Sequence, residues 1–160
     1  MSQTSYSQDN AVAFAGLVAD NAPKYSITRA SESATSVEFG RPAVAGTDAE
    51  TQFALPSTTG EFVLGVTVHH HAQQDLSSSG DGIVQDEDAE LLRSGTVWVV
   101  VEETVVAGDD VFFRHTTSGP LVPGGWRNDA DTATADQLPN AVYLTGASAD
   151  GLAKIQFNLP

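Results

Sequence analysis

The chain has 160 residues, with 7 Lys and Arg against 21 Asp and Glu, and its formal net charge is −14. It contains no cysteine, which excludes disulfide scaffolds, cysteine-ligated metals and thiol catalysis. Nucleic acids and anionic membranes are bound through gathered Lys and Arg side chains. The cations here are scattered singly along the chain, so we expect neither partner.

The composition favours an all-β fold. The sequence holds 17 Val and 15 Thr against 3 Ile and 2 Lys, and Val and Thr favour pleated strands over helices. We predict a single domain over residues 11–160, a small β-sandwich or barrel of jelly-roll-like type with two long loops. No segment approaches the ~20 apolar residues of a bilayer span, and the amino terminus lacks the positive region of a signal peptide.

In chain order, the first ten residues are small and polar apart from Tyr6, which predicts a flexible, extended arm over residues 1–10. Residues 11–19 are apolar around Gly16 and fit a short helix or a buried extended stretch, of which we favour the second. Further along, runs rich in Val, Phe and Thr between Gly and Pro predict short strands. These are residues 25–28, 37–40, 42–44, 51–55, 62–68, 96–102, 110–116, 141–144 and 153–157.

Two of these strands have the clearest patterns. Phe62, Leu64, Val66 and Val68 recur at period two, which predicts that they share one face of a strand. Residues 97–101 are apolar at every position, so this strand is expected to be central in a sheet or to lie against another subunit.

Turns and irregular stretches separate the strands. The Ala-Gly-Asp sequence at residues 107–109 predicts a hairpin or a sharp corner. Residues 72–94 and 118–140 are predicted as the two long loops. Loops of more than about 12–15 residues in a compact domain are usually functional or mobile.

Two polar clusters are candidates for metal binding. His69 and His71 would lie on the same side of a strand and could share a metal with Asp75 or with the acidic run. We favour the alternative, in which three polar rings sit at the solvated end of a strand. The acidic run itself comprises Asp86, Glu87, Asp88 and Glu90, and a second acidic pair is Asp129 and Asp131. Neither follows the residue order of a calcium loop, so both are predicted to be solvated charges, and we predict no metal and no cofactor.

No pattern of a catalytic site is present. The chain has no Gly-x-Ser-x-Gly elbow and no glycine-rich phosphate loop. Its two tryptophans, Trp98 and Trp126, are expected to be core or interface anchors rather than sugar-binding platforms. We therefore predict that the protein is not an enzyme.

The order of several short motifs resembles the capsid cement (head decoration) proteins of tailed phages and related viruses. The motifs are a Gly-Leu-Val-Ala-Asp step at residues 16–20, a Phe-Gly-Arg step within residues 37–44, a Phe-x-x-Gly-Val step within residues 62–67, a strand ending at residues 99–101, and a Gly-Asp corner within residues 106–111. The match covers roughly residues 12–115. The acidic insertion 72–94 and the histidine tract have no counterpart in this pattern.

The resemblance implies a structural protein of the virion that binds the outer surface of an assembled head. Such a protein would form a homotrimer and hold neighbouring subunits of the major capsid protein together. The candidate residues for contacts with the capsid or between subunits are Tyr6, Phe14, Leu17, Trp98 and Trp126. The alternative function is a ligand- or glycan-binding β-sandwich module, similar to an adhesin, that would use Trp126 and the loop 118–140.

Overall fold

The computed structural model describes residues 13–20, 23–70 and 82–160, and their regular secondary structure consists of strands apart from one short 3₁₀ helix, which confirms the all-β prediction. The elements are β1 (Tyr25–Ser31), β2 (Pro42–Ala45), β3 (Gln52–Ala54), β4 (Val63–Thr67), β5 (Asp88–Val100), β6 (Asp110–Arg114), β7 (Trp126–Arg127), the short 3₁₀ helix η1 (Asp131–Ala133), β8 (Ala135–Tyr143) and β9 (Leu152–Asn158). Within the described ranges there is no helix long and apolar enough to cross a bilayer.

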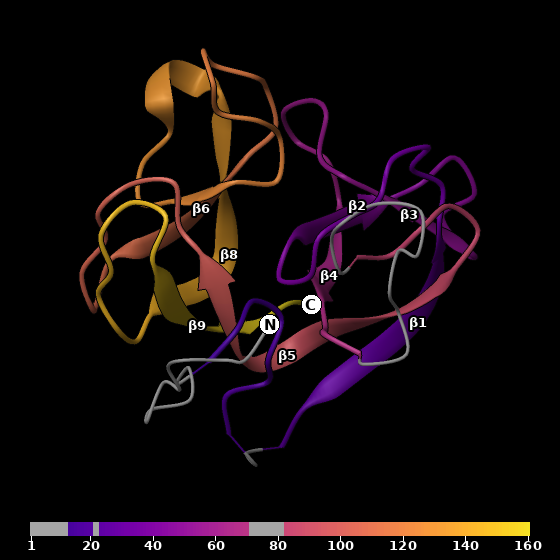
Figure 1. Cartoon of the computed structure of the whole chain (residues 1–160), viewed down its shortest axis with the longest axis horizontal. Coiled ribbons are helices and arrows are strands. Elements are labelled where there is room, and N and C mark those ends of the chain that lie inside the picture. Colours follow the sequence, from indigo (N-terminus) through magenta and orange to yellow (C-terminus); the bar gives the residue numbers. More distant parts are fainter. Residues whose placement is uncertain (1–12, 21–22, 71–81) are drawn as a thin grey trace, which may run out of the picture.

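The strands close into two small rings that share β5. In ring one the order is β1-β3-β2-β4-β5, and β1 pairs with β5 to close it. In ring two the order is β5-β9-β8-β6-β7, and a parallel bridge between Val101 and Trp126 closes it. Figure 1 shows the two rings as separate lobes, with β5 running from one to the other. The sandwich-or-barrel expectation is thereby refined to two barrel-like rings rather than the facing sheets of a jelly roll.

Strand β5 is central, as the sequence predicted. Its first half pairs with β1 and β4 in ring one, and its second half, Ser94 to Val100, pairs with β9 in ring two. The two faces of the second half differ in burial, however: Val97 and Val99 point into the core, whereas on the opposite face Thr96 is buried, Trp98 is half-buried and Val100 is 36% exposed. There are two apolar cores: one lies inside ring one, and the other is formed by ring two together with the sides of β2 and β4 that face it; β5 contributes to both.

The prediction that alternate residues from Phe62 to Val68 share one face was wrong. Opposite β2, Val44 pairs with Val63 and Ala43 with Gly65, so Leu64 is an extra residue in β4. Such a β-bulge shifts the alternation of side chains by one position. As a result Leu64 joins the core of ring one, Val66 joins that of ring two, and Phe62 is 57% exposed.

The structure decides between the two predictions for residues 107–109 and changes the predictions for both long loops. Strands β5 and β6 do not pair in the sheet, so residues 101–109 form the corner rather than the hairpin. The predicted loop 72–94 is shorter than expected, because β5 already begins at Asp88; residues 71–81 of it lie outside the described residues. The predicted loop 118–140 is interrupted by β7, η1 and the start of β8. The predicted arm, residues 1–10, also lies outside the described residues.

Candidate interaction surface

An amino-terminal segment, residues 13–20, lies along β5 at the waist between the two rings. The Gly16 amide donates to the Trp98 carbonyl at 2.8 Å, and the Trp98 amide donates to the Leu17 carbonyl at 2.9 Å. Because β1 pairs with β5 only as far as Ser94, the segment occupies the edge of β5 that β1 leaves free. It is extended at Val18, which bridges Val97, after a turn at residues 15–16.

The waist brings together three of the residues predicted to contact partners, namely Phe14, Leu17 and Trp98. Val18 lies opposite Val97, so Leu17 lies opposite Trp98, and on the other side of β5 Trp98 lies opposite Lys154. Cross-strand neighbours of this kind share one face of a sheet, here the outward face. The Lys154 ammonium stands 5.2 Å from the centroid of the Trp98 ring.

Phe14 and Leu144 extend this row at its two ends. The Phe14 carbonyl accepts a hydrogen bond from the Leu17 amide at 3.2 Å, and the Phe14 side chain is 39% exposed. Leu144 donates its amide to the Lys154 carbonyl at 2.8 Å and is exposed to a similar degree. We call Phe14, Leu17, Trp98, Lys154 and Leu144 the waist surface.

The first histidine of the tract packs against this surface. The ring centroid of His69 lies 4.5 Å from that of Phe14 and 4.6 Å from that of Phe39. Its amide donates to the Gly16 carbonyl at 3.0 Å. His71 lies outside the described residues, and among those that are described no three His, Asp or Glu residues are grouped so as to hold a metal.

Tyr6 and Trp126, the remaining predicted contact residues, are not on this surface. Tyr6 lies outside the described residues. Trp126 is 0% exposed, and its indole Nε1 donates to the Gly40 carbonyl at 2.6 Å. It is therefore a core residue of ring two, and its prediction as a contact residue is corrected, because its side chain has no surface to offer to a partner.

The Phe-Gly-Arg step that the resemblance relied on joins the two rings. Gly40 receives the indole hydrogen bond of Trp126, and Arg41 donates from Nη1 to the Gly124 carbonyl at 3.1 Å. Arg41 also forms an ion pair with Glu38. One short segment of ring one is thus bonded to the β7 region of ring two directly behind the waist.

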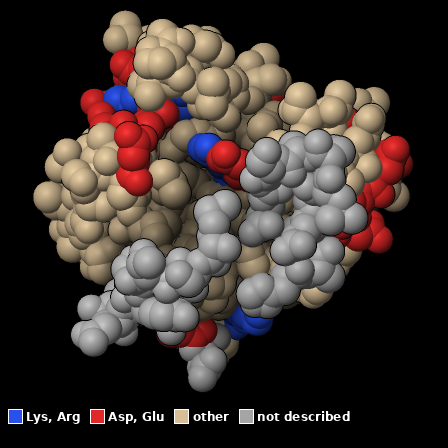
Figure 2. All heavy atoms as spheres, viewed as in Figure 1, with Lys and Arg blue, Asp and Glu red and all other residues tan. Residues whose placement is uncertain are grey.

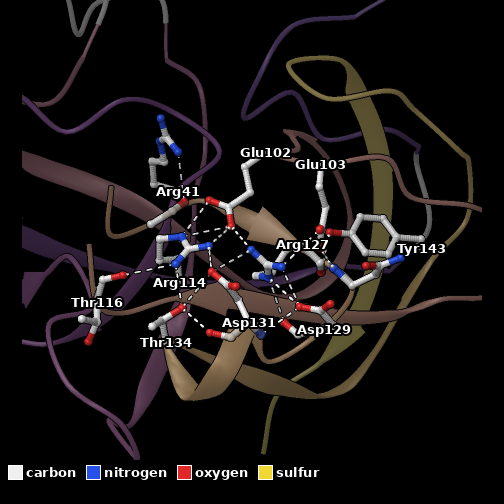
Figure 3. Close-up of polar contacts among 12 residues, drawn as sticks. Arg41, Glu102, Glu103, Arg114, Thr116, Arg127, Asp129, Asp131, Thr134 and Tyr143 are labelled. Carbon is white, nitrogen blue, oxygen red and sulfur yellow. Dashed lines mark hydrogen bonds and ion pairs between the residues drawn. The ribbon is translucent and has the colours of Figure 1, made fainter. Parts of the chain in front are cut away.

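A network of ion pairs around two buried arginines links the elements of that β7 region (Figure 3). Arg114 and Arg127, both almost completely buried, each place a guanidinium nitrogen 2.7 Å from Oε1 of Glu102. Arg114 also pairs with Asp131 at 2.7 Å, and Arg127 with Asp129 at 2.6 Å. The network links the corner after β5 to the residues on both sides of β7.

The electrostatics of the network follow from these contacts. The hydrogen bond from Arg127 holds the pKa of Asp129 below its usual range, and the bond from Arg114 does the same for Asp131. Burial raises the pKa of Tyr143, whose hydroxyl donates to the Arg127 carbonyl at 3.0 Å. Asp129 and Asp131 are therefore partners of arginines, not the solvated charges that the sequence predicted.

The acidic run at residues 86–90 has exposed charges at Asp86 and Asp88, as predicted, but differs from its prediction in secondary structure. Asp88 and Glu90 belong to β5, where they pair in register with Ala30 and Thr28 of β1. Glu90 lies 3.7 Å from the ammonium of Lys24. Half of this acidic run is thus part of a strand rather than of a loop.

Comparisons with known proteins agree with the predicted resemblance. A family model described as a phage structural cement protein (E217 gp24/Pam3 gp6) matches residues 2–158. A solved chain from "The capsid of Myoviridae Phage XM1" has a similar fold, with a TM-score of 0.70 and 18% identity over 98% of this chain and 96% of that one. No protein with a curated description matches.

Proposed function

The chain belongs to the phage structural cement protein family, and on that premise we propose that it binds the outer surface of an assembled head as a homotrimer and holds neighbouring major capsid subunits together. Its role is structural, as the family description states, and we assign it no catalytic step. Each copy would contribute modest contacts, and many copies would sum to a large stabilisation of the shell.

The observation that carries this proposal is the placement of residues 13–20 at the waist. Residues 1–12 precede a segment that is hydrogen-bonded to β5 and to His69 and lies in close backbone contact with Gly40, so the predicted arm would leave the molecule from a fixed point. The partly exposed side chains of the waist surface lie beside that point. If the arm paired with a capsid subunit, the waist surface would then be brought against that same subunit.

The charge of the molecule supports a protein partner. On the face drawn in Figure 2, acidic side chains gather on both lobes and few cations are visible. Arg114 and Arg127 are buried, and Arg41 and Lys24 are paired with carboxylates. The described surface therefore has no cationic face of the kind that binds phosphate backbones.

The experiment is a deletion of residues 1–10, measured by binding to heads purified without this protein. We expect a folded protein with an unchanged unfolding temperature and clearly weaker head binding. Light scattering on the intact protein tests the trimer separately. If the shortened chain occupied heads as fully as the intact protein, the arm would not be needed for head binding.

The alternative of a glycan-binding module loses its principal residue. That function required Trp126 to face a ligand, whereas its side chain is buried and its indole nitrogen is bonded to Gly40. We therefore propose no sugar-binding function.

A further inference from the structure

A groove of about 450 Å³ lies between the two rings, away from the waist surface. One wall is formed by residues 59–63 of ring one, and the other by β6, β8 and the last residues of the chain. In Figure 1 the carboxyl terminus lies between the two lobes. The apolar residues of the lining are Phe62, Val63, Phe113, Pro139, Leu159 and Pro160.

Phe62 gives this groove an exposed aromatic wall. It lies just before β4, belongs to neither apolar core and is 57% exposed. The guanidinium carbon of Arg93 stands 5.9 Å from its ring centroid, and Arg93 also donates to the Pro160 carbonyl. A large exposed aromatic at the edge of an apolar groove is typical of a protein contact site.

Two carboxylates form an anionic rim. Asp136 accepts hydrogen bonds from the Gly60 amide at 2.6 Å and the Thr59 hydroxyl at 3.0 Å, and Glu61 accepts one from the Ser57 amide at 2.7 Å. In the described part of the chain neither carboxylate has a Lys or Arg within ion-pair distance, although His115 Nε2 lies 3.6 Å from Asp136. The fold uses their oxygens as acceptors but leaves their charge uncompensated by a permanent cation.

We propose that this groove receives an apolar side chain of a major capsid subunit that is followed or preceded by Lys or Arg. The apolar side chain would pack between Phe62 and the floor formed by Phe113 and Leu159, and the cation would face Glu61 and Asp136. The inference rests on the proposed function and adds a second contact to the waist surface, with a defined chemistry for the partner.

The charges favour a capsid subunit over a second copy of this chain. Lys24, Arg41, Arg114 and Arg127 are already in ion pairs with carboxylates of their own chain. Arg93 borders the groove itself. Of the other two cations, Lys154 stands over the Trp98 ring of its own chain and Arg29 is half-buried. A second copy therefore has few cations left to place beside an apolar side chain, whereas a foreign partner has no such restriction.

The test uses the full chain, titrated onto heads purified without it, with three variants. Phe62→Ala removes the aromatic wall, and Glu61→Gln removes a rim charge while keeping an acceptor oxygen for Ser57. Val106→Ala is the matched control, because Val106 is 58% exposed and lies at the corner before β6, remote from the groove. Thermal unfolding verifies that each variant is folded.

We expect Phe62→Ala to weaken head binding by about tenfold or more. Glu61→Gln should weaken head binding less and should reduce the salt dependence of binding. Val106→Ala should bind like the wild type. Unchanged binding by Phe62→Ala would overturn the groove while leaving the proposed function intact. A groove variant that changed only the oligomeric state would identify a second copy as the occupant of the groove and would also overturn the proposal. If the wild type itself did not bind heads, the proposed function and the groove assignment would both fail.

Discussion

Gly16 and Gly40 touch backbone to backbone at the waist. A Cβ atom built on Gly40 would lie 2.8 Å from the amide nitrogen of Gly16, and one built on Gly16 would lie 2.8 Å from the amide nitrogen of His69. Both glycines have positive φ, +79° and +74°, a region that side chains other than glycine rarely adopt. Only glycine at both positions lets the amino-terminal segment lie this close to the joint between the rings.

Replacing Gly40 with Ala should therefore destabilise the protein by more than backbone strain alone. Strain at positive φ costs roughly 1–2 kcal/mol, and the contact with backbone atoms adds to it because they cannot rotate away. Gly60→Ala is the matched control, since Gly60 has φ +76° but no atom within 4 Å of a built Cβ. Thermal unfolding should show a clearly larger fall for Gly40→Ala; equal falls would mean that the close approach is unimportant.

Removal of Glu102 should be the most damaging change in the ion-pair network. Its side chain is 8% exposed and contacts both Arg114 and Arg127, so Glu102→Ala leaves two buried guanidinium groups without their shared partner. Breaking a buried pair in this way costs about 3–5 kcal/mol, which corresponds to a fall in Tm of roughly 6–20 °C for a chain of this size.

The matched control for this substitution is Glu38→Ala. Glu38 also pairs with an arginine, Arg41, but its side chain is 68% exposed. Exposed pairs contribute about 0–1 kcal/mol, so the expected fall in Tm is small. A Tm for Glu102→Ala as high as that of Glu38→Ala would show that the network contributes little to stability.

The protein should lose stability when the pH falls below about 4. Hydrogen bonds hold the pKa of Asp129 and Asp131 below the ordinary value of 3.8, so the unfolded chain binds protons more readily than the folded one. Their contribution is fully present above the unfolded pKa and is lost as the pH falls through the lower, folded pKa. Unfolding temperatures between pH 7 and pH 2.5 should decline most steeply at the acid end.

A variant identifies the groups responsible for that decline. In Asp131→Asn the amide does not titrate, so the curve should start lower at pH 7 and fall less on acidification. A curve parallel to that of the wild type would assign the acid sensitivity to other carboxylates. One of these is Asp109, whose pKa is lowered mainly by the hydrogen bond from Asn128.

The sequence predicted the strands well but not how they close. The apolar run at residues 97–101 located the second half of β5, and the alternating pattern at residues 153–157 located β9, because burial in a strand leaves a local pattern. The closure of two rings depends on pairings between distant strands, such as β1 with β5, and on the bulge at Leu64. Neither leaves a signal within a short window of sequence.

The site was predicted in part for a similar reason. Phe14, Leu17 and Trp98 were selected as large apolar side chains, and the structure brings them to one waist. The network around Arg114 was missed, because charged residues in an acidic chain are expected to be solvated. The available signal was an arginine directly after Val111 to Phe113, in a strand whose neighbours are apolar.

The waist surface leads to a last prediction about binding. Phe14→Ala removes an aromatic ring that is 39% exposed and packs on His69, so it should weaken binding to heads by about tenfold while the molecule stays folded. Val84→Ala is the matched control, with 37% exposure in the turn before β5 and no place on the waist. Binding is measured by titration onto heads purified without the protein, and unfolding temperature is measured in parallel. If Phe14→Ala binds as well as Val84→Ala, the contacts of Phe14 serve only to fix the amino-terminal segment, and the surface that meets the capsid must be sought elsewhere, beginning with the groove at Phe62.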